Sequence, residues 1–126
     1  KALYYKGKSL WEEGEREDAV EALGDVAENP KDVMGAEAAY LLIKDAFDSG
    51  NFDKVETLVF ALSEQKTGER FYLAKSYLLL GDSYLEKGDK EGAKQVYQSI
   101  YKSYNGQGDI KAIAKSKMDA IGKKNK

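Results

Sequence analysis

Three short turn signals divide this chain at nearly regular intervals. Each is a glycine followed by a polar residue, and the signals lie 36 and 38 residues apart, at Gly14-Glu15, Gly50-Asn51 and Gly88-Asp89. Glycine readily adopts the left-handed conformation just past a helix end, and Asn or Asp can accept hydrogen bonds from the free amides of the next helix. Because apolar-periodic segments flank every signal, the spacing predicts three helix–turn–helix units.

The hydrophobic periodicity predicts seven helices in all. They are expected near residues 2–13, 16–28, 32–48, 52–65, 69–87, 90–104 and 109–121. The last helix places its apolar residues on one stripe and lysines on the other side, the pattern of a cap that covers the end of a stack. On the sixth helix Tyr97, Tyr101 and Tyr104 share one face, which favours a role in the core.

The third unit carries the most specific motif, which has small residues where two helices must approach closely. It reads Tyr77-x-x-Leu80-Gly81-x-x-Tyr84, then Gly88-Asp89, then Ala93-x-x-x-Tyr97. This pattern resembles the tetratricopeptide repeat (TPR) motif nearly position for position. Weaker copies in phase with it are Leu3-x-x-Lys6-Gly7-x-x-Leu10 with Ala19-x-x-x-Leu23, and Ala39-x-x-Leu42-Ile43-x-x-Ala46 with Val55-x-x-x-Val59.

The resemblance implies an all-α, right-handed α-solenoid of three TPR-like hairpins and a C-terminal capping helix. We expect one domain over residues 1–126, with repeats at about 1–31, 32–68 and 69–108 and the cap at about 109–122. One hairpin cannot bury both of its faces, so neighbours must stack in series. The first hairpin has no such cover, which predicts that the chain is the C-terminal part of a longer repeat array and self-associates through helices 1 and 2. The run at 35–42 resembles TPR segments of bacterial cell-envelope assembly proteins, which suggests that compartment.

Composition argues against several classes of function. The chain has no cysteine and no histidine, so thiolate chemistry, cysteine–zinc sites and the commonest general base are absent. The acidic cluster around the first turn is read as a solvated turn, and we expect no catalytic residue, metal site or cofactor. The net charge of −2 does not suit a nucleic-acid-binding protein, and no apolar run is long enough to span a membrane. The chain is therefore predicted not to be an enzyme.

In TPR proteins the first helix of each hairpin lines a concave groove, so the resemblance implies a set of partner-binding residues there. They are Tyr4, Lys8, Trp11, Tyr40, Lys44, Phe47, Leu78, Asp82 and Leu85. Aromatic side chains interleaved with cations are typical of recognition surfaces. Packing against the next repeat is an alternative role for Trp11, Phe47 and Leu85, and solvation is one for Lys8 and Lys44. The predicted function is binding of a peptide or partner protein in the groove; the alternative is a structural or self-assembly segment of a longer scaffold.

Overall fold

A computed structural model describes the backbone of residues 1–124 and the side chains of residues 1–122. Within this range there are seven helices and no strand. The helices are α1 (Ala2–Glu12), α2 (Arg16–Ala27), α3 (Val33–Asp48), α4 (Phe52–Glu64), α5 (Arg70–Glu86), α6 (Lys90–Ser103) and α7 (Ile110–Lys124). The predicted all-α repeat fold is confirmed, and the helix boundaries agree with the predicted ones to within about three residues.

The three glycines of the turn signals adopt the conformation that the sequence predicts. Gly14, Gly50 and Gly88 have φ angles of +83°, +76° and +85°, so a side chain at these positions would be strained. After two of them the next residue caps the following helix: the Asn51 side chain accepts from the Lys54 amide, and Asp89 accepts from the Gly92 amide. The first turn differs, because its polar residue is a glutamate whose side chain makes no cap hydrogen bond.

The two helices of each hairpin meet at a seam where residue sizes are matched. A Cβ atom on Gly81 would lie 2.4 Å from Cε1 of Tyr97, so the tyrosine ring occupies the space that glycine leaves. In the first hairpin Gly7 accommodates Leu23 in the same way. The middle hairpin has Ile43 in place of glycine at this position, and there the opposing residue is the smaller Val59, which is buried in the same cluster. The three pairs therefore fill the seam with different combinations of side-chain volume.

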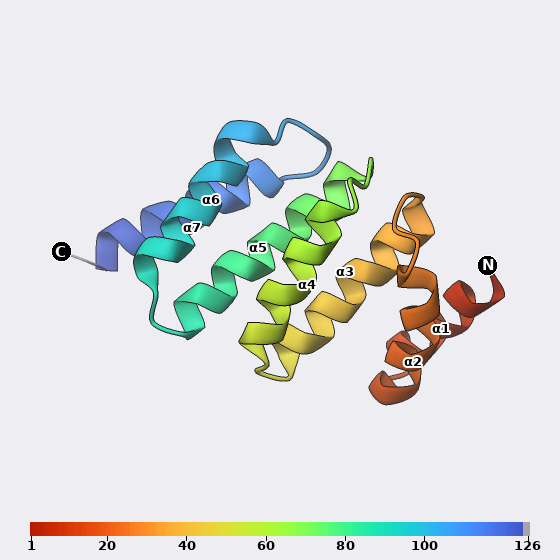
Figure 1. Cartoon of the computed structure of the whole chain (residues 1–126). Coiled ribbons are helices and arrows are strands. Elements are labelled where there is room, and N and C mark those ends of the chain that lie inside the picture. The colour runs from red at the N-terminus through yellow and green to blue at the C-terminus, as the bar shows by residue number, and fades with distance from the viewer. Residues whose placement is uncertain (125–126) are drawn as a thin grey trace.

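The core consists of three clusters of buried residues that follow one another along the stack. One lies between α2 and α3, the next between α3, α4 and α5, and the last between α5, α6 and α7. Figure 1 shows the helices following one another across the molecule, with the two termini at opposite ends. This arrangement is the series of stacked hairpins that the repeat spacing predicts, because each apolar face is buried only by its neighbour.

From the second hairpin onward, the first helices lie closer together than the second helices. α3 packs against α5 and α5 against α7, whereas no comparable packing joins α2 to α4 or α4 to α6, all of which are fully described. The stack therefore curves with its first helices on the inner side. α7 occupies the next first-helix position and covers α6 with Ile110, Ala114 and Ile121, which are almost completely buried. Among the described residues, no helix combines the length and the apolar character needed to cross a membrane.

Candidate partner-binding surfaces

Side chains on the inner side connect consecutive first helices, and we call this surface the first-helix face. It comprises Tyr4, Lys8, Glu37, Tyr40, Tyr72, Lys75, Asp82 and Lys117. Between α1 and α3, Glu37 accepts hydrogen bonds from the Tyr4 hydroxyl and from Lys8, whose Nζ lies 2.5 Å from its carboxylate. The hydrogen bond to Glu37, aided by burial, raises the pKa of Tyr4. Two of the predicted binding residues therefore hold the first two hairpins together.

The second predicted lysine is also paired within the chain. Lys44 Nζ lies 2.7 Å from Asp48, and the other oxygen of this carboxylate lies 3.1 Å from the Arg16 guanidinium. Burial opposes ionisation of Asp48, but the hydrogen bonds from Lys44 and Arg16 outweigh it and lower its pKa. Arg16 also stacks over the Trp11 ring, 3.6 Å from its centroid, so this network joins the first hairpin to α3.

Between α3 and α5 the face carries a cluster of aromatic rings around one cation. Lys75 Nζ lies 4.5 Å from the centroid of the Tyr40 ring, 5.2 Å from that of Phe71 and 5.9 Å from that of Tyr72. The Tyr40 and Tyr72 rings are themselves 6.2 Å apart. Burial raises the pKa of both tyrosines, which favours their neutral form. Lys75 has no carboxylate partner among the residues whose side chains are described.

Between α5 and α7 the bridging carboxylate is Asp82. It accepts from the Tyr97 hydroxyl at 2.5 Å and lies 3.0 Å from Lys117 Nζ. Burial of Tyr97, together with its hydrogen bond to Asp82, raises the pKa of the tyrosine. Asp82 thus links the seam of the third hairpin to the capping helix.

The four apolar residues of the predicted set are half-buried against the core. Trp11 packs on the first cluster, Phe47 on the second, and Leu78 and Leu85 on the third. Their role in partner binding stays a prediction. Sequence reasoning missed Glu37 and Lys75, which stand three residues before Tyr40 and Leu78 on the same helix face. That i, i+3 relation to predicted groove positions is the signal that could have identified them.

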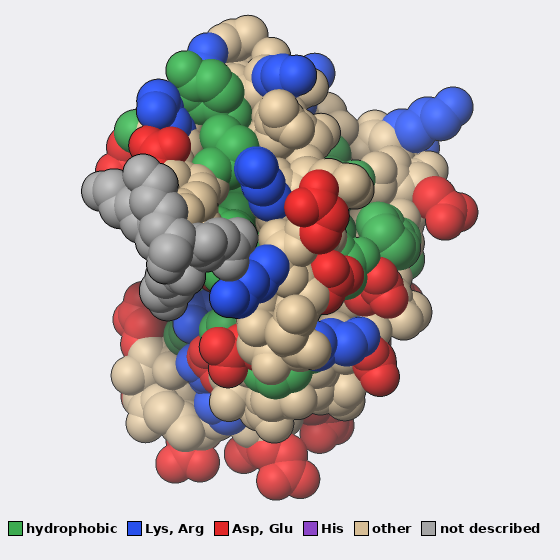
Figure 2. Space-filling model, turned by 90° about the vertical axis from the view of Figure 1, so that its left-hand side faces the viewer, with side chains coloured by type: hydrophobic (Ala, Val, Ile, Leu, Met, Phe, Trp, Pro, Cys, Tyr) green, Lys and Arg blue, Asp and Glu red, His purple; other side chains and the backbone are tan. Residues whose placement is uncertain are grey.

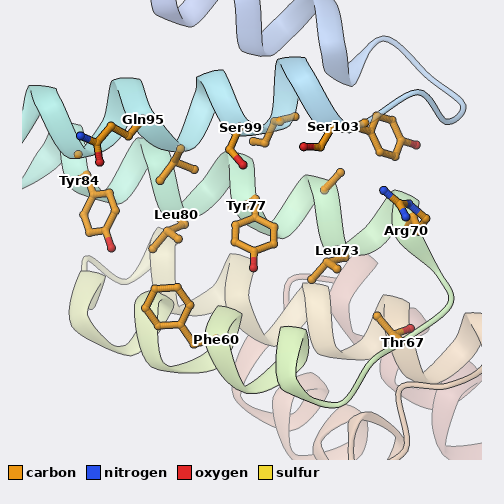
Figure 3. Close-up of a pocket in the computed structure, with 15 residues that line it drawn as sticks. Phe60, Thr67, Arg70, Leu73, Tyr77, Leu80, Tyr84, Gln95, Ser99 and Ser103 are labelled. Atoms are coloured by element: carbon orange, nitrogen blue, oxygen red, sulfur yellow. The ribbon is translucent and has the colours of Figure 1, made fainter.

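A second candidate surface lies on the outer side, where α4 and α6 diverge over α5. This α4–α6 groove has a volume of about 570 Å³. In Figure 3 Leu73, Tyr77 and Leu80 from α5 form its floor, Phe60 stands on the α4 wall, and α6 contributes the small or polar stripe Gln95, Ser99 and Ser103. Phe60 is 44% exposed, so part of its ring is accessible to solvent beside the groove.

The corresponding space between the first two hairpins is much smaller. The gap between α2 and α4 over α3, lined by residues such as Ala39, Leu42 and Leu58, measures about 180 Å³. The two gaps occupy equivalent places in the stack, so the larger one is a property of the third hairpin and not of the fold in general.

The charges do not form a field of one sign on the end of the molecule that carries α6 and α7. In the part of that face described in Figure 2, Lys and Arg side chains are mixed with Asp and Glu over the middle, acidic side chains gather along the lower edge, and hydrophobic side chains form small groups. The described residues also bring no three acidic side chains together as a metal ion would require.

The tetratricopeptide repeat model matches residues 1–32 and 71–105, which together make up more than half of the chain. Two parts are unmatched. One is the middle hairpin, in which Ile43 and Val59 replace the glycine and large residue of the seam, and the other is residues 106–126, which include the capping helix. Comparison with curated proteins finds no match. Tetratricopeptide repeats generally mediate protein–protein interactions and typically serve as non-enzymatic scaffolds. The motif, the stacked hairpins and the match agree, and this chain belongs to the tetratricopeptide repeat family.

Proposed function

We propose that this protein is a protein–protein interaction module that binds a peptide segment of its partner along the inner, first-helix side of the stack. The observation that carries the proposal is Lys75. It is a cation held between three aromatic rings, and no described carboxylate neutralises it. A partner that supplies an acidic side chain or a terminal carboxylate would complete the site.

The cluster around Lys75 has the composition of a binding hot spot. Tyr40 and Tyr72 offer large rigid rings with a polar tip, and such residues lose little conformational entropy on binding. A charge-assisted hydrogen bond to the ammonium group contributes roughly 1.5–3 kcal/mol. This corresponds to about a ten- to hundredfold change in affinity.

The other charges of the first-helix face support this site from either side. Lys8 with Glu37, and Asp82 with Lys117, cross-link successive first helices and so hold the surface in one geometry before a partner arrives. Preorganisation of this kind lowers the entropic cost of association. We therefore assign these pairs a positioning role and assign Lys75 the direct contact.

Selection of displayed, flexible 12-residue peptides against the wild-type protein tests the proposal. Lys75→Glu should weaken the selected acidic peptides by about tenfold or more. The control Lys94→Glu makes the same charge change at an exposed position of α6, on the other side of the stack, and should leave affinity within about twofold. Equal binding to wild type and Lys75→Glu would refute the proposed site.

The second candidate function is a structural segment of a longer TPR scaffold that has no ligand of its own. Its support is apolar exposure on the first hairpin, where Leu3 and Tyr5 of α1 are 42% and 60% exposed. Such a face suits stacking against a further helix or a second copy. Failure to select any peptide, together with concentration-dependent sedimentation that Leu3→Glu abolishes, would favour this function. A bacterial cell-envelope location stays a prediction from the resemblance.

A further inference from the structure

We infer that the α4–α6 groove is a second binding site, whose ligand is an amphipathic helix of a partner protein. The docked helix presents an apolar stripe to α5 and carries an acidic residue or a terminal carboxylate at its C-terminal end. This site lies on the opposite side of the stack from the first-helix face.

The groove has the size and shape for a helix of a few turns. Its floor runs along α5 from Arg70 to Tyr84, which spans roughly 21 Å at about 1.5 Å per residue. The volume of about 570 Å³ accommodates several apolar side chains. On the α6 wall Gly92, Gln95, Ser99 and Ser103 face the groove at intervals of three or four residues. The glycine and the two serines of this row are small enough to allow another helix to approach closely.

The backbone chemistry of the walls favours a helix over an extended strand. α4, α5 and α6 are helices whose backbone groups are hydrogen-bonded internally, so they offer no sheet edge. An extended peptide would have to leave many of its own backbone groups unpaired against an apolar floor, which is costly. A helix satisfies its backbone groups itself and buries only side chains.

The charges at the two ends define the direction of the docked helix. Among the described residues that line the groove, Arg70 is the only charged one, and no described side chain forms an ion pair with it. At the other end Tyr84 donates to Glu56, and Asp89 lies close enough to influence its titration. Because a helix is positive at its N-terminus and negative at its C-terminus, the C-terminal end belongs beside Arg70. The docked helix then runs antiparallel to α5, as α4 and α6 do.

A displayed library of amphipathic helices of about 14–18 residues, the length that spans the floor, provides the test. Helices selected on the wild-type protein are measured against Ser99→Trp and Phe60→Glu, which respectively fill the groove and charge its wall. Ser99 and Phe60 are both exposed, so the fold should tolerate these changes, and circular dichroism verifies this. The matched control is Gln98→Trp, at an exposed neighbour that does not line the groove.

Both groove variants should weaken the selected helices by about tenfold or more, whereas Gln98→Trp should have less than about a twofold effect. Arg70→Glu should weaken helices with acidic C-terminal ends, and it should not weaken the same helices after those acids are replaced by glutamine. Undiminished binding to Ser99→Trp and Phe60→Glu, or loss caused only by Lys75→Glu, would overturn the inference. So would failure to select a helix, occupation of the groove by dodecanoate alone, or a Ser99→Trp-sensitive dimer of the chain.

Discussion

Gly81 marks the closest approach of two helices, and replacing it with alanine tests the seam directly. The added methyl group would lie 2.4, 2.8 and 2.9 Å from three ring atoms of Tyr97. The ring is held in place, since Tyr97 is 0% exposed and its hydroxyl donates to Asp82. We therefore expect Gly81→Ala to destabilise the protein, although alanine is the better helix former.

Gly24, in the interior of α2, supplies the matched control. A Cβ atom there meets nothing within 4 Å, so Gly24→Ala should stabilise the protein by roughly 0.5–1 kcal/mol. The gain in helix propensity is common to both substitutions. The difference between the two variants is therefore the cost of overpacking at Gly81, about 1–3 kcal/mol. With an unfolding entropy of about 2.1 cal/mol/K per residue, each kcal/mol corresponds to about 4 °C in Tm for a chain of this length.

Urea titrations followed by circular dichroism measure this difference. A double-mutant cycle with Tyr97→Val then tests whether the Tyr97 ring causes the cost of overpacking. Valine is chosen because the middle hairpin already combines a larger residue, Ile43, with Val59. In the Tyr97→Val background, Gly81→Ala should become neutral or stabilising. If Gly81→Ala stabilises the wild-type protein as much as Gly24→Ala does, the explanation of the seam is wrong.

Three further changes test the turns, the tyrosines and the link between the first two hairpins. Asn51→Ala and Asp89→Ala should each lower the free energy of unfolding by about 1 kcal/mol. Glu15→Ala removes no cap hydrogen bond and should change it very little. Equal losses in all three variants would contradict the capping assignment. Burial and the hydrogen bond to Glu56 raise the pKa of Tyr84 from 10.0 to about 12, so its contribution to stability is fully present below pH 10 and is lost as the pH rises to about 12. Between pH 10 and 12 the free energy of unfolding should fall less steeply for Tyr84→Phe than for the wild-type protein. An identical decline in the two proteins would refute this. Glu37→Gln should accelerate hydrogen exchange in α1 while leaving α7 unchanged, and a uniform increase would contradict a local link.

The sequence could predict the helices and turns because local chemistry determines them. Gly14, Gly50 and Gly88 mark helix ends through their own backbone conformation, whatever packs around them. The apolar periodicity of the last helix identifies the stripe that covers α6. Of the predicted tyrosine row, Tyr97 on α6 and Tyr104, which follows the end of α6, are buried as predicted, and Tyr101 is half-buried. These features depend on spacing within one hairpin or one helix.

The contacts between hairpins could not be predicted in the same way. The repeats differ in length, so the motif positions within one repeat do not reveal which side chain of the next repeat faces them. The pairing of Lys8 with Glu37, and the rings around Lys75, depend on how consecutive first helices are placed. The α4–α6 groove depends on how far two second helices diverge, which no single residue specifies.

The most direct test of the account is the position of the bound peptide on the protein. Backbone amide shifts in ¹H–¹⁵N spectra, recorded during titration with an acidic peptide selected on the wild-type protein, would map it. We predict the largest changes around Tyr40, Tyr72 and Lys75, and their loss in Lys75→Glu. Changes confined to the second helices α2, α4 and α6 would contradict the claim that the first-helix face recognises the partner.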